Sequence, residues 1–417
     1  MNKDANDTVL SSYSYTYDKA GNRLSVSENG GSAVSYGYDN VYQLTSETRT
    51  GTNAYTILYQ DDDAGNRTQM VKNSVTTTYT YNNNNQLSTE TTSGTTTTYS
   101  YDLNGNLLSK AVGGNTTSYT WDWRNYLLSV SQAGGSTSYE YDGDGTRISK
   151  TQSAVKTKYI NDVALPLVQV LLETNNAGTV QAVYTYGNDL ISMKRAGANS
   201  YYLYDGLGSA RQLTNSAGSV IVSYMYDGFG NLVASTGSSA NPYGFTGQQQ
   251  FGEADSLVFL RARYYKPSTG RFISRDPTGY EDGINLYEYA MDNPVNKTDP
   301  TGLLVLKCPK TVAGARRDPG LCDDGFGNQL HPGQHCYREV VPIGTKGQPA
   351  GLHCCYKGGK LVNHHIDAID IATGGGGGKC RKDDPCRYAE HALFDVVIPY
   401  LQKPRPEMWD DQSLWWY

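Results

Sequence analysis

Two aspartates introduce the same short motif late in the chain. Asp276-Pro277-Thr278-Gly279 is followed, after a further nineteen residues, by Asp299-Pro300-Thr301-Gly302-Leu303. Two carboxylates that share one proton provide a base and an acid at once, which is the chemistry that hydrolyses a peptide bond. The motif is also a good turn sequence, because Pro fixes φ at its second position and Gly ends the turn. Taken alone, these residues favour two turns.

A second group of candidates lies near the C-terminus. The run Asn363-His364-His365-Ile366-Asp367, together with Asp370 and His391, resembles the start of a ββα-metal nuclease motif of the HNH type. In that motif one histidine activates water, while a second histidine and an Asp or Asn hold a divalent metal. The later Asn and His of the motif are not clear here, and this part of the chain is not basic. Surface or core histidines are therefore the favoured interpretation, and the metal of this region stays unknown.

The cysteines mark the same region. All seven cysteines and all six histidines follow residue 303. The first interpretation is that the cysteines form structural disulfides, which would stabilise a domain that is poor in aliphatic residues. A zinc site is a second interpretation, although no Cys-x-x-Cys occurs and the spacing of Cys380 and Cys386 is irregular. Unpaired thiols are the third, since the adjacent Cys354 and Cys355 cannot easily pair with each other.

A sequence repeat predicts the secondary-structure elements that must position these residues. A Tyr-x-Tyr-Asp signature, or a close variant, returns about every twenty residues, and a fixed period of this kind indicates one supersecondary unit copied and stacked. Its clearest copies begin at Tyr15, Tyr36, Tyr79, Tyr99, Tyr119, Tyr139, Tyr202 and Tyr224.

Each copy reads as a β-hairpin. Two alternating aromatics point to one face of a strand. A Gly-Asn turn then follows the Asp, as in Ala20-Gly21-Asn22 and Asn104-Gly105-Asn106. Gly and Asn adopt positive φ readily, and Asp can bond its own backbone. The repeats therefore predict an all-β fold, a curved antiparallel β-strip or partial cocoon, held by tyrosine rings in place of an aliphatic core. Taken alone, the repeats also fit a plain β-solenoid with a purely structural role.

Composition supports a division into three parts. The chain has 417 residues, with 45 Gly, 35 Tyr, 18% charged residues and a net charge of −6, which implies no general attraction to nucleic acid or membranes. Residues 304–417 hold 14 Lys+Arg and 13 Asp+Glu, which leaves 21 and 28 for the part before them. We expect repeats over 1–228, a different segment over 229–303, and a small α+β domain over 304–417.

The N-terminus carries no visible signal peptide and no apolar run long enough to span a membrane. We therefore expect either export by a non-classical route or a chain that is a piece of a longer protein, and the lack of any lead-in before the first repeat favours the second.

Residues 10–303 resemble a known family. The repeats resemble YD repeats, and the segment with Leu260-Arg261-Ala262-Arg263-Tyr264-Tyr265, both Asp-Pro-Thr-Gly motifs and Asn285-Leu286-Tyr287-Glu288-Tyr289 resembles the Rhs repeat-associated core domain. This family includes bacterial polymorphic toxins and the C components of insecticidal toxin complexes. The resemblance implies a hollow β-cocoon, closed at one end by the core domain, which frees a variable C-terminal toxin by cutting its own chain in an aspartic-protease-like reaction.

The resemblance also implies the residues of that reaction. The cut would fall between Leu303 and Leu304, with Asp276 and Asp299 as the acid–base pair and Arg275 holding or orienting one carboxylate. Glu288 and Asp292 are spare carboxylates that could replace either aspartate. No cofactor is implied for the shell, and that of the C-terminal domain stays unknown.

Two functions follow as hypotheses. The first is an Rhs-type toxin carrier, secreted or displayed at the cell surface, with an immunity protein and a type VI or toxin-complex apparatus as partners. The alternative is a structural or adhesive surface protein whose C-terminal domain is an inactive, disulfide-rich cap. Because family cocoons use more repeats than this chain holds, we expect a partial, open shell.

Overall fold

The computed structural model describes residues 2–3, 7–165 and 167–303, together with the backbone of 321–323, 335–339, 352–357 and 360–366. It divides into two compact units, one formed by residues 1–280 and 285–304 and the other by residues 281–284 and 305–417. Each unit is described by itself.

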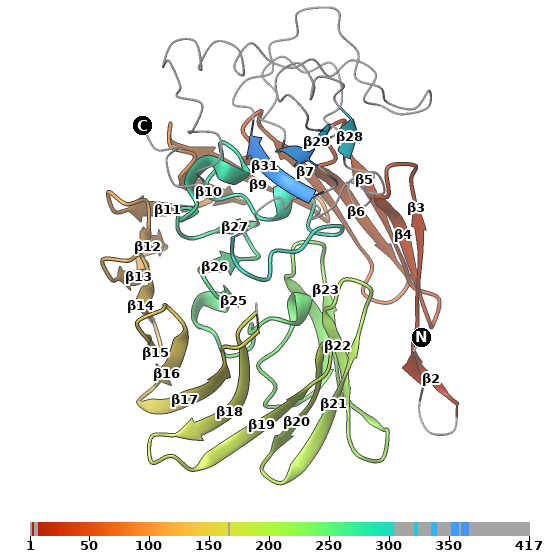
Figure 1. Ribbon diagram of the computed structural model, residues 1–417, viewed down its shortest axis with the longest axis vertical. Helices are drawn as coiled ribbons and strands as arrows, with labels where there is room; N and C mark the ends of the chain where they lie inside the picture. The colour runs from red at the N-terminus through yellow and green to blue at the C-terminus, as the bar shows by residue number, and fades with distance from the viewer. Residues whose placement is uncertain are drawn as a thin grey trace, which may run out of the picture. The chain divides into compact units, whose positions relative to one another are not determined.

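The first unit is built on one long antiparallel sheet of 22 strands, β3 to β24, each paired with the next along the chain (Figure 1). Among the described strands no paired residues join β24 to β3, so the sheet is not closed. The prediction of an all-β, open strip of hairpins is confirmed. The two ends of this sheet approach each other, and we call this place the seam.

The strands are short and regular, as the repeat period requires. Their bounds are β3 (Tyr13–Tyr17), β4 (Arg23–Glu28), β5 (Ala33–Tyr38), β6 (Leu44–Thr50), β7 (Tyr55–Asp61), β8 (Arg67–Lys72), β9 (Val75–Tyr81), β10 (Leu87–Thr92), β11 (Thr95–Tyr101), β12 (Leu107–Val112), β13 (Asn115–Trp121), β14 (Leu127–Gln132), β15 (Gly135–Tyr141), β16 (Arg147–Gln152), β17 (Val155–Asp162), β18 (Gln169–Asn175), β19 (Val180–Tyr186), β20 (Leu190–Arg195), β21 (Ala198–Tyr204), β22 (Ala210–Thr214), β23 (Val220–Tyr226) and β24 (Leu232–Gly237). A small separate sheet pairs β1 (Asn2–Lys3) with β2 (Val9–Ser11).

The aspartate of each repeat closes the turn that follows it. In the copy after β11, Oδ1 of Asp102 accepts the backbone N–H of Asn106 at 2.7 Å, and Oδ2 accepts its side-chain amide at 2.9 Å. Gly105, between them, has φ +85°, a conformation that glycine adopts without a steric penalty. Asp18 and Asp227 hold their own turns in the same way.

The second aromatic connects neighbouring hairpins in several of the repeats. A register shift precedes it in the strand, and its polar tip donates to the first strand carbonyl after the preceding turn. The pairs, with their donor–acceptor distances, are Tyr38 to Arg23 at 2.7 Å, Tyr81 to Arg67 at 2.8 Å, Trp121 to Leu107 at 2.7 Å, Tyr141 to Leu127 at 3.0 Å and Tyr204 to Leu190 at 2.7 Å.

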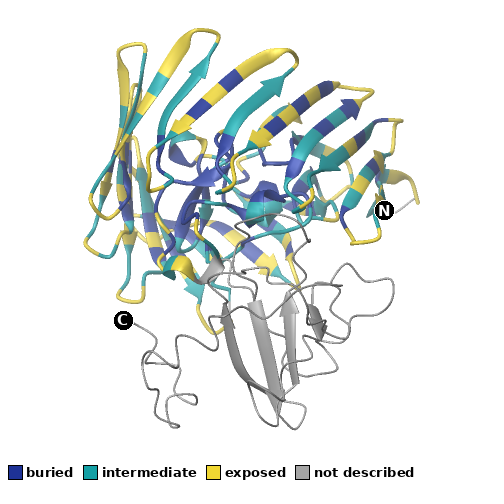
Figure 2. Cartoon of the chain, turned by 90° about the horizontal axis from the view of Figure 1, so that it is seen from above, coloured by how far each residue is buried: buried dark blue, intermediate teal, exposed yellow. Residues whose placement is uncertain are grey.

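The rest of the first unit, residues 238–280 and 285–303, packs on the inner face of the curved sheet (Figure 2), and we call it the inner segment. Its rings and aliphatic side chains meet the first aromatics of the repeats, as where Tyr139 contacts Tyr264 and Tyr202 contacts Tyr243. The inner segment contains η1 (Phe245–Gly247), η2 (Ala254–Ser256), β25 (Val258–Leu260), β26 (Arg263–Lys266), β27 (Arg271–Phe272) and η4 (Ala290–Asp292), and η3 (Gly279–Asp282) begins in it. The repeat tyrosines therefore need the inner segment to complete their core.

The described part of the second unit is a four-stranded antiparallel sheet. Its strands, in sheet order, are β28 (Leu321–Asp323), β29 (His335–Glu339), β30 (Leu352–Lys357) and β31 (Lys360–Ile366). None of the helices in the described part of the chain has the length and apolar content that a membrane span requires.

Candidate functional site: two aspartates on one guanidinium

Both motif aspartates lie against the same arginine, Arg263. Nη2 of Arg263 is 2.6 Å from Oδ2 of Asp276 and 3.6 Å from Oδ2 of Asp299. The exposed fractions are 3% for Arg263, 8% for Asp276 and 1% for Asp299, so all three charged groups are buried together. A buried cation shared by two carboxylates compensates for only one negative charge, which favours a single proton on the pair.

Three stretches of the inner segment bring these side chains together. Arg263 begins β26, and its guanidinium lies 3.6 Å from the ring centre of Phe272 on β27. Asp276 follows β27, where its backbone N–H donates to the carbonyl of Leu286 at 2.9 Å. The second motif is tied to the turn between β25 and β26, because the N–H of Ala262 donates to the carbonyl of Thr301 at 3.0 Å.

The two aspartates have different surroundings. Oδ1 of Asp276 accepts the backbone N–H of Thr278 at 2.8 Å and the hydroxyl of the same residue at 2.5 Å. With Arg263 on its other oxygen, Asp276 has contacts that suit a carboxylate anion.

Asp299 is the more isolated of the pair. Its Oδ1 lies 3.0 Å from both the hydroxyl of Thr301 and the N–H of Leu303. Its Oδ2 is buried and, within the described residues, accepts no hydrogen bond. Burial raises the pKa of Asp299 above its ordinary value, although Arg263 and the bonds from Thr301 and Leu303 oppose this shift. The burial of Asp299 and its unbonded oxygen therefore favour a proton on this member of the pair.

The predicted arginine, Arg275, lies elsewhere. It is exposed, and its side chain lies against Gly105, where an added Cβ would meet Cδ of Arg275 at 2.3 Å. The guanidinium that contacts the two aspartates belongs to Arg263, which the sequence motifs did not identify as a candidate. The apolar run from Leu257 to Tyr265 holds two arginines, Arg261 and Arg263, and a buried cation needs an anionic partner, but the run does not show which arginine meets the aspartates.

The spare carboxylates form a separate cluster. Glu288 is hydrogen-bonded to Asp292, and both lie beside Gly65, in a turn of the sheet, with Asp61 at the end of β7. Burial raises the pKa of Glu288 to about 7 and that of Asp61 to about 6. No described contact joins this cluster to Asp276 or Asp299.

The candidates of the second unit are only partly described. His364 and His365 lie on β31, opposite Cys354 and His353 of β30 in the backbone register. The side chains of this sheet, and the whole of Leu304, Asp367 and His391, lie outside the described residues. Where residues are described, no group of three or more His, Cys, Asp or Glu side chains is placed to hold a metal.

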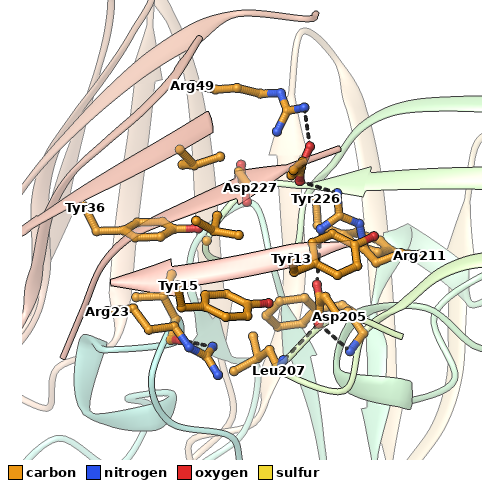
Figure 3. Close-up of a pocket in the computed structure, with 17 residues that line it drawn as sticks. Tyr13, Tyr15, Arg23, Tyr36, Arg49, Asp205, Leu207, Arg211, Tyr226 and Asp227 are labelled. Atoms are coloured by element: carbon orange, nitrogen blue, oxygen red, sulfur yellow. Dashed lines mark hydrogen bonds and ion pairs between the residues drawn. The ribbon is translucent and has the colours of Figure 1, made fainter. Parts of the chain in front are cut away.

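A small pocket lies at the seam (Figure 3), and neither Asp276 nor Asp299 lines it. Its volume is about 50 Å³, room for water rather than for a substrate. The charged groups in it pair with one another: Glu28 accepts from Arg49 at 2.6 Å and from Arg211 at 2.9 Å, and Arg211 also contacts Asp205 at 3.2 Å. These contacts join β4 and β6 to β22, so the pocket is part of the seam's structure.

Comparison with known proteins identifies the architecture. Residues 64–176 and 166–295 match the model of the Teneurin YD-shell family, which together is more than half of the chain. Among curated relatives, the tRNA nuclease WapA of Bacillus subtilis is 33% identical over 144 residues, 32% of this chain and 6% of WapA. The toxin protein Tse5 of Pseudomonas aeruginosa is 34% identical over 116 residues, 28% of this chain and 8% of Tse5.

A third curated relative and one solved structure also match part of this chain. The toxin subunit YenC1 of Yersinia entomophaga is 33% identical over 108 residues, 24% of this chain and 11% of YenC1. A crystal structure of TcdB2–TccC3 is 19% identical, covers 70% of this chain and 20% of its own, and has a TM-score of 0.37. This chain thus spans only a small part of these relatives. By its family match, the chain belongs to the Teneurin YD-shell family, and it is a toxin-related YD-repeat shell of the Rhs type.

Proposed function

We propose that the chain is a toxin carrier whose inner segment cuts the backbone between Leu303 and Leu304 and thereby separates the C-terminal domain from the shell. The observation that carries this proposal is the buried pair Asp276–Asp299 on Arg263, with the N–H of Leu303 bound to Asp299 at 3.0 Å. The acid–base pair thus contacts the residue whose carbonyl would be attacked.

The chemistry is general acid–base hydrolysis. Water adds to the carbonyl carbon of Leu303 and gives a proton to Asp276, the ionised member. The tetrahedral intermediate then collapses, the bond from that carbon to the nitrogen of Leu304 breaks, and Asp299 protonates the leaving amine. Leu303 ends as a carboxylate, Leu304 as a new N-terminus, and one water is consumed.

The wider role is inferred from the relatives. Tse5 and YenC1 are named as a toxin and a toxin subunit, which supports secretion of this chain and association with an export or toxin-complex apparatus. A separate immunity protein would protect the producing cell. The C-terminal domain, residues 304–417, is the candidate effector.

The test is the state of the chain after purification under folding conditions, read on a denaturing gel. The wild type is expected to give two fragments that meet after residue 303. Asp276→Asn and Asp299→Asn should each remain one chain, because an amide can neither hold the shared proton nor act as a base. Asp144→Asn, which changes an exposed turn aspartate, is the matched control and should be cut like the wild type.

A single wild-type band would contradict self-cleavage and would favour the structural or adhesive alternative. Two bands that persist in both Asp variants would contradict the assignment to this pair.

A further inference from the structure

The second motif contains a hydroxyl aimed at the bond that the proposed reaction breaks. Oγ1 of Thr301 lies 2.8 Å from the carbonyl oxygen of Leu303. A donor about 2.7–3.1 Å from the position that the oxyanion will occupy stabilises the negative charge of a tetrahedral intermediate. The carbonyl oxygen of Leu303 is the atom that becomes this oxyanion, and the hydroxyl already reaches it before the reaction.

We propose that Thr301 is a further catalytic residue, whose hydroxyl binds the carbonyl oxygen of Leu303 and stabilises the oxyanion formed when water adds to that carbonyl. This role rests on the proposed self-cleavage and specifies how the attacked carbonyl is activated.

The backbone fixes the carbonyl in this place. Gly302 has φ +69°, and a Cβ added there would lie 2.4 Å from the carbonyl oxygen of Leu260, so only glycine fits. The chain turns back at this glycine, and Nε of Arg263 donates to its carbonyl. The N–H of Leu303 is held at 3.0 Å by both Oδ1 of Asp299 and Oγ1 of Thr301.

The hydroxyl has one hydrogen and two acceptors. Oδ1 of Asp299 is 3.0 Å away and the carbonyl oxygen of Leu303 is 2.8 Å away. Before reaction the hydrogen is shared between them. As charge develops on the oxygen of Leu303 it becomes the stronger acceptor, so this bond strengthens in the transition state, which is the condition for catalysis rather than mere binding.

The equivalent threonine of the first motif behaves differently. The hydroxyl of Thr278 donates to Oδ1 of its own motif aspartate, Asp276, at 2.5 Å. No bond from Thr278 to the carbonyl two residues further on is found in the described part of the chain. The contact with a reacting carbonyl is thus specific to Thr301 and does not follow from the Asp-Pro-Thr-Gly sequence.

In the reaction the hydroxyl keeps its proton. Water supplies the oxygen added to Leu303, and the aspartate pair takes one proton from it and returns one to the amine of Leu304. Thr301 donates only a hydrogen bond to the oxyanion and releases it when the carbonyl reforms, so atoms and charge balance without a further reactant.

The experiment follows cleavage of the full chain with time during cell-free synthesis. Thr301→Val keeps the shape of the side chain but removes the hydroxyl, and it should slow cleavage by about 100-fold, the usual effect of losing one oxyanion donor. Thr301→Ser keeps the hydroxyl and should cut at close to the wild-type rate. Thr116→Val, which removes an exposed hydroxyl from β13, is the matched control. Melting curves show that each variant is folded.

The pH profile separates this role from an effect through Asp299. Thr301→Val also removes a hydrogen bond that lowers the pKa of Asp299, so a midpoint that depends on Asp299 should move upward in this variant. If Thr301 acts on the oxyanion, the maximal rate on the plateau of the profile falls as well. A shifted midpoint with the maximal rate retained would overturn the proposal. Cleavage of Thr301→Val at the wild-type rate would also overturn the proposal, provided that the wild type is cut and Asp299→Asn is not. A wild type that is never cut refutes the self-cleavage itself, and the role of Thr301 falls with it.

Discussion

At the scale of single residues, Arg263 decides how the two aspartates can act. Its guanidinium compensates for one of two buried carboxylates, contacts Asp276 at 2.6 Å, and also donates to the backbone carbonyls of Gly302 and Leu286. One group thus orders both the acid–base pair and the backbone next to the proposed cut. A planar fork with five N–H donors suits this task better than a single ammonium.

Arg263→Lys should therefore slow cleavage more than tenfold, because lysine keeps the charge but cannot bond two carboxylates and two carbonyls at once. Arg275→Lys is the matched control. Arg275 is exposed beside Gly105, so its substitution should leave the cleavage rate unchanged. The measurement is the fraction of cut chain against time. The reverse result, with Arg275→Lys impaired and Arg263→Lys normal, would contradict the geometry described for the pair.

The motifs identified Asp276 and Asp299 as candidates, but the sequence could not identify the arginine between them. Arg275 adjoins Asp276 in the chain, and adjacency is all that a motif can show. The direction of its side chain is set by the course of the backbone after β27. Arg263 reaches the pair only because β26 pairs with β27, a tertiary contact that no local pattern encodes.

At the scale of elements, the repeat predicts the hairpins, but it does not predict the hydrogen bonds that connect one hairpin to the next. Alternating aromatics and Gly-Asn turns were sufficient to predict antiparallel hairpins, which the structure confirms. In several repeats the second aromatic has a further role, because it donates a hydrogen bond to the preceding hairpin. This bond tolerates drift, because Trp121 supplies an indole N–H and Asn161 a side-chain amide in place of the tyrosine hydroxyl.

The hydrogen bond from a second aromatic to the preceding hairpin should make a measurable contribution to the free energy of unfolding. Tyr204→Phe removes the donor to Leu190, whose backbone carbonyl lies in the core of the sheet, and should lower the free energy of unfolding by about 1–2 kcal/mol. Tyr17→Phe is the matched control, since Tyr17 holds the same motif position but is 53% exposed, and its substitution should change little. Urea unfolding of both variants checks this. Equal losses in the two variants would show that the hydroxyl bond contributes nothing specific.

At the scale of the whole sheet, two glutamates join its ends at the seam, and the pKa of one is lowered while that of the other is raised. Glu28 of β4 pairs with Arg49 and with Arg211 of β22. Burial pushes its pKa upward, but the two arginines outweigh this and lower it. Glu47 of β6 is 1% exposed and accepts from Tyr55 and from the N–H of Gly228, after β23. Burial, with Asp227 nearby, raises its pKa to about 8.

The two glutamates should therefore give opposite pH profiles. The ordinary pKa of both is 4.5. Glu28 stabilises the fold above that value, and its contribution is lost as the pH falls through its lowered pKa. Glu47 favours the fold when protonated, so its contribution is present below 4.5 and is lost as the pH rises towards about 8.

Melting temperatures across this pH range provide the measurement. Glu28→Gln should lower the melting temperature at neutral pH, and the difference should vanish in acid. Glu47→Gln, which resembles the protonated acid, should raise the melting temperature at pH 8 and above and leave it unchanged in acid. Differences of the same sign at every pH would contradict the roles given to these two groups.

The central claim is that this shell cuts its own chain after Leu303, and the intact mass of the purified protein tests it most directly. The wild type should give two masses, one for a fragment that ends at Leu303 and one for a fragment that begins at Leu304, and Asp299→Asn should give a single full-length mass. A single wild-type mass of 45.7 kDa, or a break at any other bond, would contradict it.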